Sequence, residues 1–240
     1  MRGAMCGRYT LTAPVDAVRR YFGVSGPVPN LYPRYNLAPT QDAPVIGLAQ
    51  GGQREFRMMR WGLVPGWAKD AAIGARMINA RIETLSEKPA FRQAYRKRRC
   101  LVPADGFFEW RVSEASPAGG DAGKEPLLIR RADRSVFAFA GLWEAWTGPD
   151  GQGLRSFTIV TAPASPFLAR FHHRMPVMLD EAGGARWLDP DAKAPAAILR
   201  DHFLADELLE AVPVSRRVNR PAHDDPGVLE PVGPALRAAA

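Results

Sequence analysis

The chain has 240 residues, of which 46% are hydrophobic and 24% charged, a balance that excludes global disorder and is typical of a globular protein. Its 32 Lys and Arg residues exceed its 25 Asp and Glu residues, and the formal net charge of +7 favours phosphate-bearing partners. Two cysteines cannot build a disulfide framework in a chain of this length, and no apolar run reaches 18 residues, so we expect a cytoplasmic protein without membrane insertion.

The first predicted element is a short amphipathic helix within residues 11–23. Val15, Val18 and Phe22 recur at helical spacing, Thr12 can cap the start, and Gly23 can end the helix. The proline-rich residues that follow predict an ordered loop over 24–44.

The rest of the chain is predicted to be rich in strands. Strands are expected over 45–49, 54–65, 100–111, 126–131, 135–146, 156–162 and 175–180, helices over 88–98, 165–173 and 194–203, and a frayed end over 232–240. Because helices are inserted irregularly and no long alternation of strand and helix occurs, the pattern favours one α+β domain around a curved, mostly antiparallel sheet.

Common cofactor motifs are not found. The stretch "GQGLRS" lacks the third glycine of a dinucleotide-binding loop and is better explained as a hairpin turn. The four histidines show no metal-ligand spacing with a cysteine pair. We therefore expect neither a metal nor a cofactor.

The stretch "GFFEW" places an acidic residue in an apolar context. Strand alternation puts Phe107 and Glu109 on one face, with Phe108 and Trp110 on the other. Burial should raise the pKa of Glu109 and suit it to proton transfer near neutral pH. A structural Glu paired with an arginine is the alternative.

Two other stretches combine polar groups that could line a binding site. In "MINARIE", alternation points Asn79 and Arg81 to the same side, as a substrate wall or as a solvated face. In "FHHRMPVML", an extended backbone would place His172 and Arg174 on one side with His173 opposed, so His172 should stay neutral more readily. A surface histidine pair is the alternative.

Seven ordered blocks between Met5 and Asn219 resemble the SOS-response-associated peptidase (SRAP) family, also called abasic site processing proteins. The blocks are "MCGRYT", "RYNLAPTQ", "WGLVPGWA", "INARIET", "CLVPADGFFEW", "HHRMPV" and "VSRRVN". The resemblance implies one α+β domain with a distorted β-barrel-like core and peripheral helices. It also implies a monomer that recognises abasic sites in single-stranded DNA, including single-strand/double-strand junctions, and is associated with the nucleoid when bound.

The resemblance also implies roles for residues in these blocks. Cys6 corresponds to the nucleophile, and Asn79, Glu109 and His172 to the other active-site residues. The DNA-binding residues implied in the same way are Arg8, Asn36, Pro39, Trp67, Arg81, Trp110 and Arg174.

The resemblance further implies that the protein joins covalently to the abasic site through an N-terminal cysteine, and this crosslink would require that Cys6 carry a free α-amine. The amine attacks the open-chain aldehyde of the abasic sugar, and the thiol on the same residue closes a thiazolidine ring. We therefore expect residues 1–5 to be absent or removed, by translation from Met5 or by self-cleavage, with a domain over 6–225 and a C-terminal tail over 226–240. Cys100 is expected to be a buried spectator.

Two other functions remain open from the sequence. An N-terminal-nucleophile peptidase or amidohydrolase would use Cys6 to cleave amides and release product repeatedly. A non-catalytic reader of DNA ends or modified cytosine would keep its function after the substitution Cys6→Ala.

Overall fold

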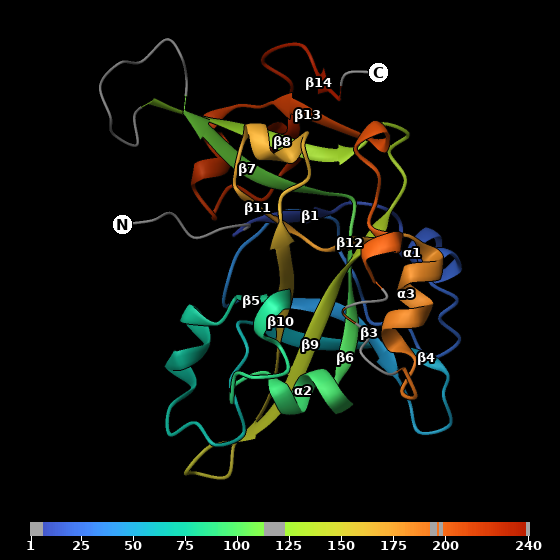
Figure 1. Ribbon diagram of the computed structural model, residues 1–240. Coiled ribbons are helices and arrows are strands. Elements are labelled where there is room, and N and C mark those ends of the chain that lie inside the picture. The colour runs from blue at the N-terminus through green and yellow to red at the C-terminus, as the bar shows by residue number, and fades with distance from the viewer. Residues whose placement is uncertain (1–6, 113–122, 193–195, 197–198, 239–240) are drawn as a thin grey trace.

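The computed structural model describes residues 7–112, 123–192, 196 and 199–238. In this part of the chain the strands form two sheets, one above the other in Figure 1. The six-stranded sheet has the order β14 (Leu236–Arg237), β13 (Leu209–Pro213), β8 (Lys124–Arg131), β7 (Gly106–Val112), β1 (Tyr9–Leu11) and β2 (Arg34–Leu37).

The second sheet closes into a barrel. Its ring runs through β10 (Gly153–Pro163), β4 (Arg54–Trp61), β3 (Asp42–Leu48), β6 (Arg99–Ala104) and β9 (Phe137–Thr147), and β9 pairs back to β10. Only the β10–β4 pair in this ring is parallel. Three short strands extend the barrel: β5 (Asn79–Arg81) and β11 (Arg174–Pro176) on β10, and β12 (Met178–Leu179) on β9. The predicted α+β fold with a mostly antiparallel, barrel-like core is confirmed.

Aromatic side chains join the two sheets. The Tyr9 ring of β1 lies 5.2 Å from the Trp61 ring and 5.9 Å from the Phe139 ring, both on barrel strands. Phe107 of β7 also packs on Phe139, at 5.9 Å between ring centroids. All four side chains are almost fully buried, so one continuous core spans the barrel and the sheet above it.

Helices lie on the outside of the barrel (Figure 1). The predicted helices within 11–23 and 88–98 are found as α1 (Val15–Tyr21) and α2 (Arg92–Lys97). None of the helices in the described residues is long and apolar enough to span a membrane. The 3₁₀ helices that the described residues form are η1 (Ala71–Arg76), η2 (Ile82–Thr84), η4 (Leu168–Arg170), η5 (Leu199–His202), η6 (Asp206–Leu208), η7 (Arg216–Asn219) and η8 (Pro226–Leu229).

A third α-helix, α3 (Glu181–Leu188), was not predicted from the sequence. Its two glycines conceal a helical pattern, yet they are needed for close packing. A Cβ on Gly183 would lie 2.6 Å from the Cβ of His202, and one on Gly184 would lie 3.3 Å from Leu101 of β6. The glycines therefore let α3 approach its neighbours.

The helix predicted over 165–173 is much shorter in the structure. The region 165–173 contains only η4. In the helix predicted over 194–203, residue 196 is helical and residues 199–202 form η5, while residues 194–195 and 197–198 lie outside the described residues. The chain must turn sharply after η4 to enter β11, and the backbone N–H of His172 bonds to the Leu168 carbonyl at 3.0 Å to make this turn. A longer helix would not permit that return.

The expectations for the loop and the tail also need correction. The predicted loop over 24–44 contains β2 and the start of β3, because its prolines flank β2 and leave the residues from Arg34 to Leu37 free to pair with β1. The predicted frayed end over 232–240 contains β14, which pairs with β13 through Ala211 and Leu236.

Candidate functional site

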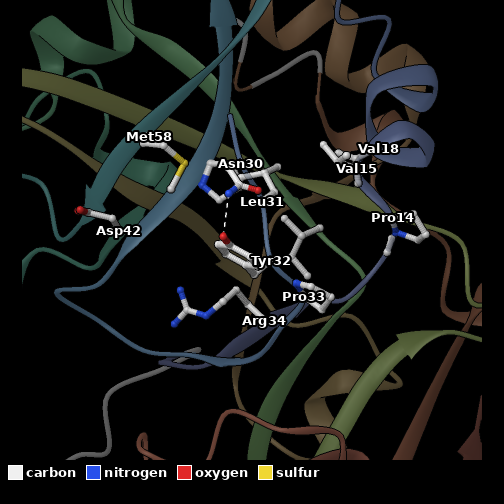
Figure 2. Close-up of a pocket in the computed structure, with 13 residues that line it drawn as sticks. Pro14, Val15, Val18, Asn30, Leu31, Tyr32, Pro33, Arg34, Asp42 and Met58 are labelled. Carbon is white, nitrogen blue, oxygen red and sulfur yellow. Dashed lines mark hydrogen bonds between the residues drawn. The ribbon is translucent and has the colours of Figure 1, made fainter. Parts of the chain in front are cut away.

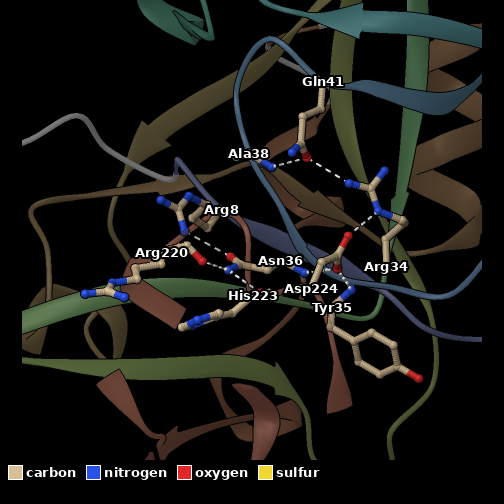
Figure 3. Close-up of polar contacts among 9 residues, drawn as sticks. All are labelled: Arg8, Arg34, Tyr35, Asn36, Ala38, Gln41, Arg220, His223 and Asp224. Atoms are coloured by element: carbon tan, nitrogen blue, oxygen red, sulfur yellow. Dashed lines mark hydrogen bonds and ion pairs between the residues drawn. The ribbon is translucent and has the colours of Figure 1, made fainter. Parts of the chain in front are cut away.

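Arg8, which lies just before β1, is held by one compact set of hydrogen bonds (Figure 3). Its Nη1 donates to the Asn36 Oδ1 at 3.0 Å and to the Val218 carbonyl at 2.7 Å, and its Nη2 donates to the Asn219 carbonyl at 3.3 Å. Burial lowers the pKa of the Arg8 guanidinium. These contacts fix the start of β1 against η7, which lies more than 200 residues away in the chain.

Asn36 of β2 is the centre of this network. Its side chain has no exposed surface, and its Nδ2 donates to the carbonyls of Val218 (3.1 Å), Arg220 (3.1 Å) and His223 (2.8 Å). The resemblance implied a DNA-binding role for Asn36. Because the side chain is fully buried, its part in such a role would be to position Arg8 and the segment 218–223.

The same network holds the turn that contains Pro39. The Asp224 carboxylate accepts two backbone N–H groups of β2 and forms an ion pair with Arg34 at 2.5 Å. Arg34 also donates to the Gln41 side chain at 2.8 Å, and the same Gln41 oxygen accepts the Ala38 N–H at 3.0 Å (Figure 3). The half-buried Pro39 is therefore fixed at the end of β2.

Trp110 and Glu109 lie on opposite faces of the six-stranded sheet, as strand alternation predicted. Phe107 belongs to the main core and Phe108 to a separate cluster against which Trp110 packs. Alternation therefore turns Glu109 towards the barrel and Trp110 towards the outer face. The half-buried Trp110 donates its indole N–H to the Asn219 Oδ1 at 2.8 Å.

The predicted burial of Glu109 is confirmed, because the residue is only 5% exposed. It pairs in register with Leu127 of β8. The backbone N–H of Phe108, one residue earlier, donates to the Arg8 carbonyl at 3.0 Å. Glu109 thus lies close to the start of β1, and its role in proton transfer stays a prediction.

Asn79 and Arg81 border the other side of the site on β5. This strand runs parallel to β10, with Ala80 fully buried between the half-buried Asn79 and the exposed Arg81. The prediction that Asn79 and Arg81 share a face is confirmed by this alternation. The indole N–H of Trp61, which packs on Tyr9, donates to the carbonyl of Ile78 at 3.0 Å and so links the start of β5 to β1.

His172 lies in the turn before β11, where its ring is fixed by the backbone. Its Nδ1 lies 3.1 Å from both the backbone N–H and the carbonyl oxygen of Arg174, so the neutral ring accepts from the first or donates to the second according to its tautomer. Burial is the largest cause of a lowered pKa of His172. A neutral imidazole is therefore favoured.

The expected opposition of His172 and His173 is wrong. Their rings lie 4.4 Å apart at an angle of 32°. The reason is that the two residues belong to a turn, and extended backbone begins only at Arg174.

Arg174 is engaged by an acidic residue that sequence reasoning missed. Its Nη1 and Nη2 pair with the two carboxylate oxygens of Glu83 at 2.5 and 2.9 Å, and Nη2 also donates to the Thr161 carbonyl at 2.7 Å. The Arg174 hydrogen bonds hold the pKa of Glu83 below its ordinary value. Arg174 is only 9% exposed, so it is held in a structural ion pair here, and a phosphate would have to replace Glu83.

Trp67 presents its ring to solvent in the loop after β4, where it is 60% exposed. The loop is anchored because the Trp146 indole N–H donates to the Ala68 carbonyl at 2.7 Å. Trp67 borders an open groove together with Lys69 and Arg76. An exposed aromatic ring beside two cations is typical of a surface that binds single-stranded nucleic acid.

Cys6, the predicted nucleophile, lies outside the described residues. The described residues with predicted site roles fall into groups of their own. Glu109, Asn79 and the core residue Tyr9 belong to the region between the sheet and the barrel, whereas Arg8 and Trp110 contact η7 on the outer face. Glu83 and Asp224 were not found from the sequence, although Glu83 lies within the block "INARIET".

A separate apolar groove lies beside α1 (Figure 2). Its walls include Val15, Val18, Pro33 and the exposed Tyr32 and Met58. None of the described residues with a predicted site role lines it.

Within the described part of the chain, no group of three or more His, Cys, Asp or Glu residues could hold a metal ion.

Comparison with known proteins shows likeness along almost the whole chain. A sequence model of the family described as SOS response associated peptidase (SRAP) matches residues 5–221. Abasic site processing protein YoqW of Bacillus subtilis (strain 168) is 39% identical over 230 residues, covering 94% of this chain and 99% of the relative. Abasic site processing protein HMCES of Rattus norvegicus is 30% identical over 269 residues, covering 95% of this chain and 76% of the relative.

The fold is also shared with a solved structure. The X-ray structure of a protein from Bacteroides thetaiotaomicron superposes with a TM-score of 0.81 at 26% identity, covering 95% of this chain and 100% of that one. The seven sequence blocks, the barrel and these matches all indicate the same family. The chain belongs to the SOS response associated peptidase (SRAP) family.

Proposed function

We propose that this protein recognises abasic sites in single-stranded DNA and forms a covalent crosslink with them through Cys6. One observation carries the proposal: β1, which begins three residues after Cys6, pairs with the β7 strand of Glu109 and is linked through Trp61 to Ile78, the residue that precedes the β5 strand of Asn79. The relatives named as abasic site processing proteins support the same substrate.

The chemistry suits an N-terminal cysteine. The neutral α-amine, with a pKa of about 7.7 to 8.0, attacks the C1′ aldehyde of the ring-opened sugar, and loss of one water gives an imine. The Cys6 thiolate then adds to the imine carbon while the nitrogen takes up a proton. The product is a five-membered thiazolidine with no carbonyl left to hydrolyse, and its closure is fast because both nucleophiles belong to one residue.

This route requires that no peptide bond precede Cys6. Either Met5 is an initiator that is removed, or the protein hydrolyses its own Met5–Cys6 bond. The latter would account for a peptidase activity limited to its own N-terminus.

Three described residues are proposed to assist the reaction. Glu109, buried and turned towards the barrel, transfers protons during opening of the sugar ring and loss of water. Asn79 holds the amine or a sugar oxygen. His172 supports proton transfer, and its burial and lowered pKa favour the neutral ring that this role needs.

The remaining residues are proposed to bind the strand around the lesion. Trp67 and Trp110 stack on bases, and Arg81 and Arg8 attract phosphates, while Pro39 lines the path of the strand. Stacking and phosphate contacts tolerate any base, so no sequence specificity is expected.

The test combines two measurements on one preparation. Intact mass spectrometry identifies the N-terminal residue, and a denaturing gel detects a retained band after incubation with an abasic single-stranded oligonucleotide. Protein that begins at Cys6 should give a stable adduct, whereas Cys6→Ala, which has the amine but no thiol, should give none that survives without reduction of the imine. Cys6→Ser keeps the amine without the thiol, so it should give an adduct that survives only after reduction of the imine.

Two results would contradict the proposal. The absence of any adduct from protein that begins at Cys6 would overturn crosslinking. Repeated release of an amide-hydrolysis product, without an adduct, would instead favour an N-terminal-nucleophile amidohydrolase.

A further inference from the structure

The surface beside Trp110 carries arginines to which neither the proposed function nor the matched blocks assign a role. Arg216 opens η7 and Arg220 follows it, and both are exposed. In the described part of the chain their guanidinium groups make no hydrogen bond or ion pair. Asn219, between them, accepts the Trp110 indole N–H at 2.8 Å.

The backbone of this segment is held from the inside. The carbonyls of Val218 and Arg220 accept from the Asn36 amide at 3.1 Å each, and the Val218 carbonyl also accepts from Arg8 at 2.7 Å. Figure 3 shows the result for Arg220, whose carbonyl points to Asn36 while its side chain extends away from the network. A fixed backbone reduces the entropy lost when these arginines bind a ligand.

The acidic groups next to this segment are already neutralised. Asp225 pairs with Arg217 at 3.0 Å, and Asp224 pairs with Arg34 at 2.5 Å. The charges of Arg216 and Arg220 are therefore a local excess. Planar guanidinium groups of this kind match the oxygens of a phosphodiester.

We infer that Arg216 and Arg220 form a phosphate-binding pair that holds the DNA backbone beside the base stacked on Trp110. The inference rests on the proposed function, because it concerns the same single strand. It adds two phosphate contacts on the outer face of the six-stranded sheet, where Trp110 meets η7.

The experiment measures the affinity for an undamaged single-stranded oligonucleotide by fluorescence anisotropy over a series of salt concentrations. Each phosphate contact contributes about 0.7 to the slope of log affinity against log salt. The double variant R216A/R220A should therefore lower the magnitude of the slope by about 1.4. The variant R216K/R220K, which keeps both charges, should retain most of it.

A charge-matched control distinguishes direct contact from net charge. Arg92 and Arg96 are exposed on α2, on the other side of the barrel from the six-stranded sheet (Figure 1), and R92A/R96A removes the same charge. This control should keep close to the wild-type slope. Equal slopes for the two double variants would overturn the inference.

The result also separates this inference from the proposed function. If wild-type protein crosslinks to abasic DNA while R216A/R220A binds with an unchanged slope, only the phosphate-binding pair is wrong. If R216A/R220A lowers the slope as expected but wild-type protein that begins at Cys6 gives no adduct, the crosslinking proposal is wrong and the phosphate contacts stand.

Discussion

The indole N–H of Trp110 and the side-chain oxygen of Asn219 form a 2.8 Å hydrogen bond across 109 positions of the chain. The backbone carbonyl of the same Asn219 accepts from Arg8 at 3.3 Å. Asn219 therefore connects an aromatic ring proposed to stack on a base with the strand that follows Cys6. Substitutions at this link should affect DNA binding more than stability, because the bond lies near the surface.

Asn219→Ala should weaken binding to single-stranded DNA through loss of this bond. A net hydrogen bond contributes about 1 kcal/mol, so we expect an affinity loss of about fivefold. A double-mutant cycle with Trp110→Phe isolates the effect, since the phenyl ring has no N–H to donate. If Asn219→Ala weakens binding by the same factor in the Trp110→Phe background, the proposed coupling is wrong.

Asn36→Leu should destabilise the fold and loosen the segment 218–223. The substitution removes a fully buried amide, and the three backbone carbonyls of Val218, Arg220 and His223 each lose the hydrogen bond that this amide donates. We expect a loss of about 3 kcal/mol in the free energy of unfolding, measured with urea. Asn30→Ala is the control, because Asn30 is an exposed asparagine that bonds only to Tyr32 among the described residues, and it should cost less than about 0.5 kcal/mol.

Gly62→Ala should disturb the loop that carries Trp67. Gly62 has a φ of 121°, and a Cβ there would lie 2.6 Å from the Gly74 carbonyl oxygen. We expect a cost of more than about 2 kcal/mol together with weaker DNA binding. Gly52 has a φ of 84°, but a Cβ added there would meet no atom within 4 Å, so Gly52→Ala isolates the conformational cost of about 1 kcal/mol. Equal losses in the two variants would contradict a steric role for Gly62.

Much of the fold follows from local pattern, whereas the contacts within the site do not. The spacing of Val15, Val18 and Phe22 identifies α1, and alternation identifies the two faces of β7. Alternation fails at His172 and His173, because these residues belong to the turn closed by the bond from the His172 N–H to the Leu168 carbonyl, and alternation holds only for extended backbone.

The ion pair between Arg174 and Glu83 joins two residues that are 91 positions apart in the chain. The three hydrogen bonds of the Asn36 amide reach residues more than 180 positions away. Such pairings are set by how the strands associate in three dimensions. A pattern read over a few neighbouring residues contains no information about them, so the sequence could identify the strands of the site without identifying the network that fixes them.

The pH dependence of stability should report on His172. Its pKa is lowered in the folded protein, so protons bind more readily to the unfolded chain, and stability falls as the pH falls from about 6.5 through the folded-state pKa. His172→Gln should remove this part of the loss, which urea unfolding at pH 8, 6 and 5 would measure. His173→Gln should retain most of it, because burial of His172, and not the charge of His173, is the largest cause of the shift. A folded-state titration of the His172 ring above pH 6.5, observed by NMR, would contradict both the burial argument and the neutral imidazole proposed for the reaction.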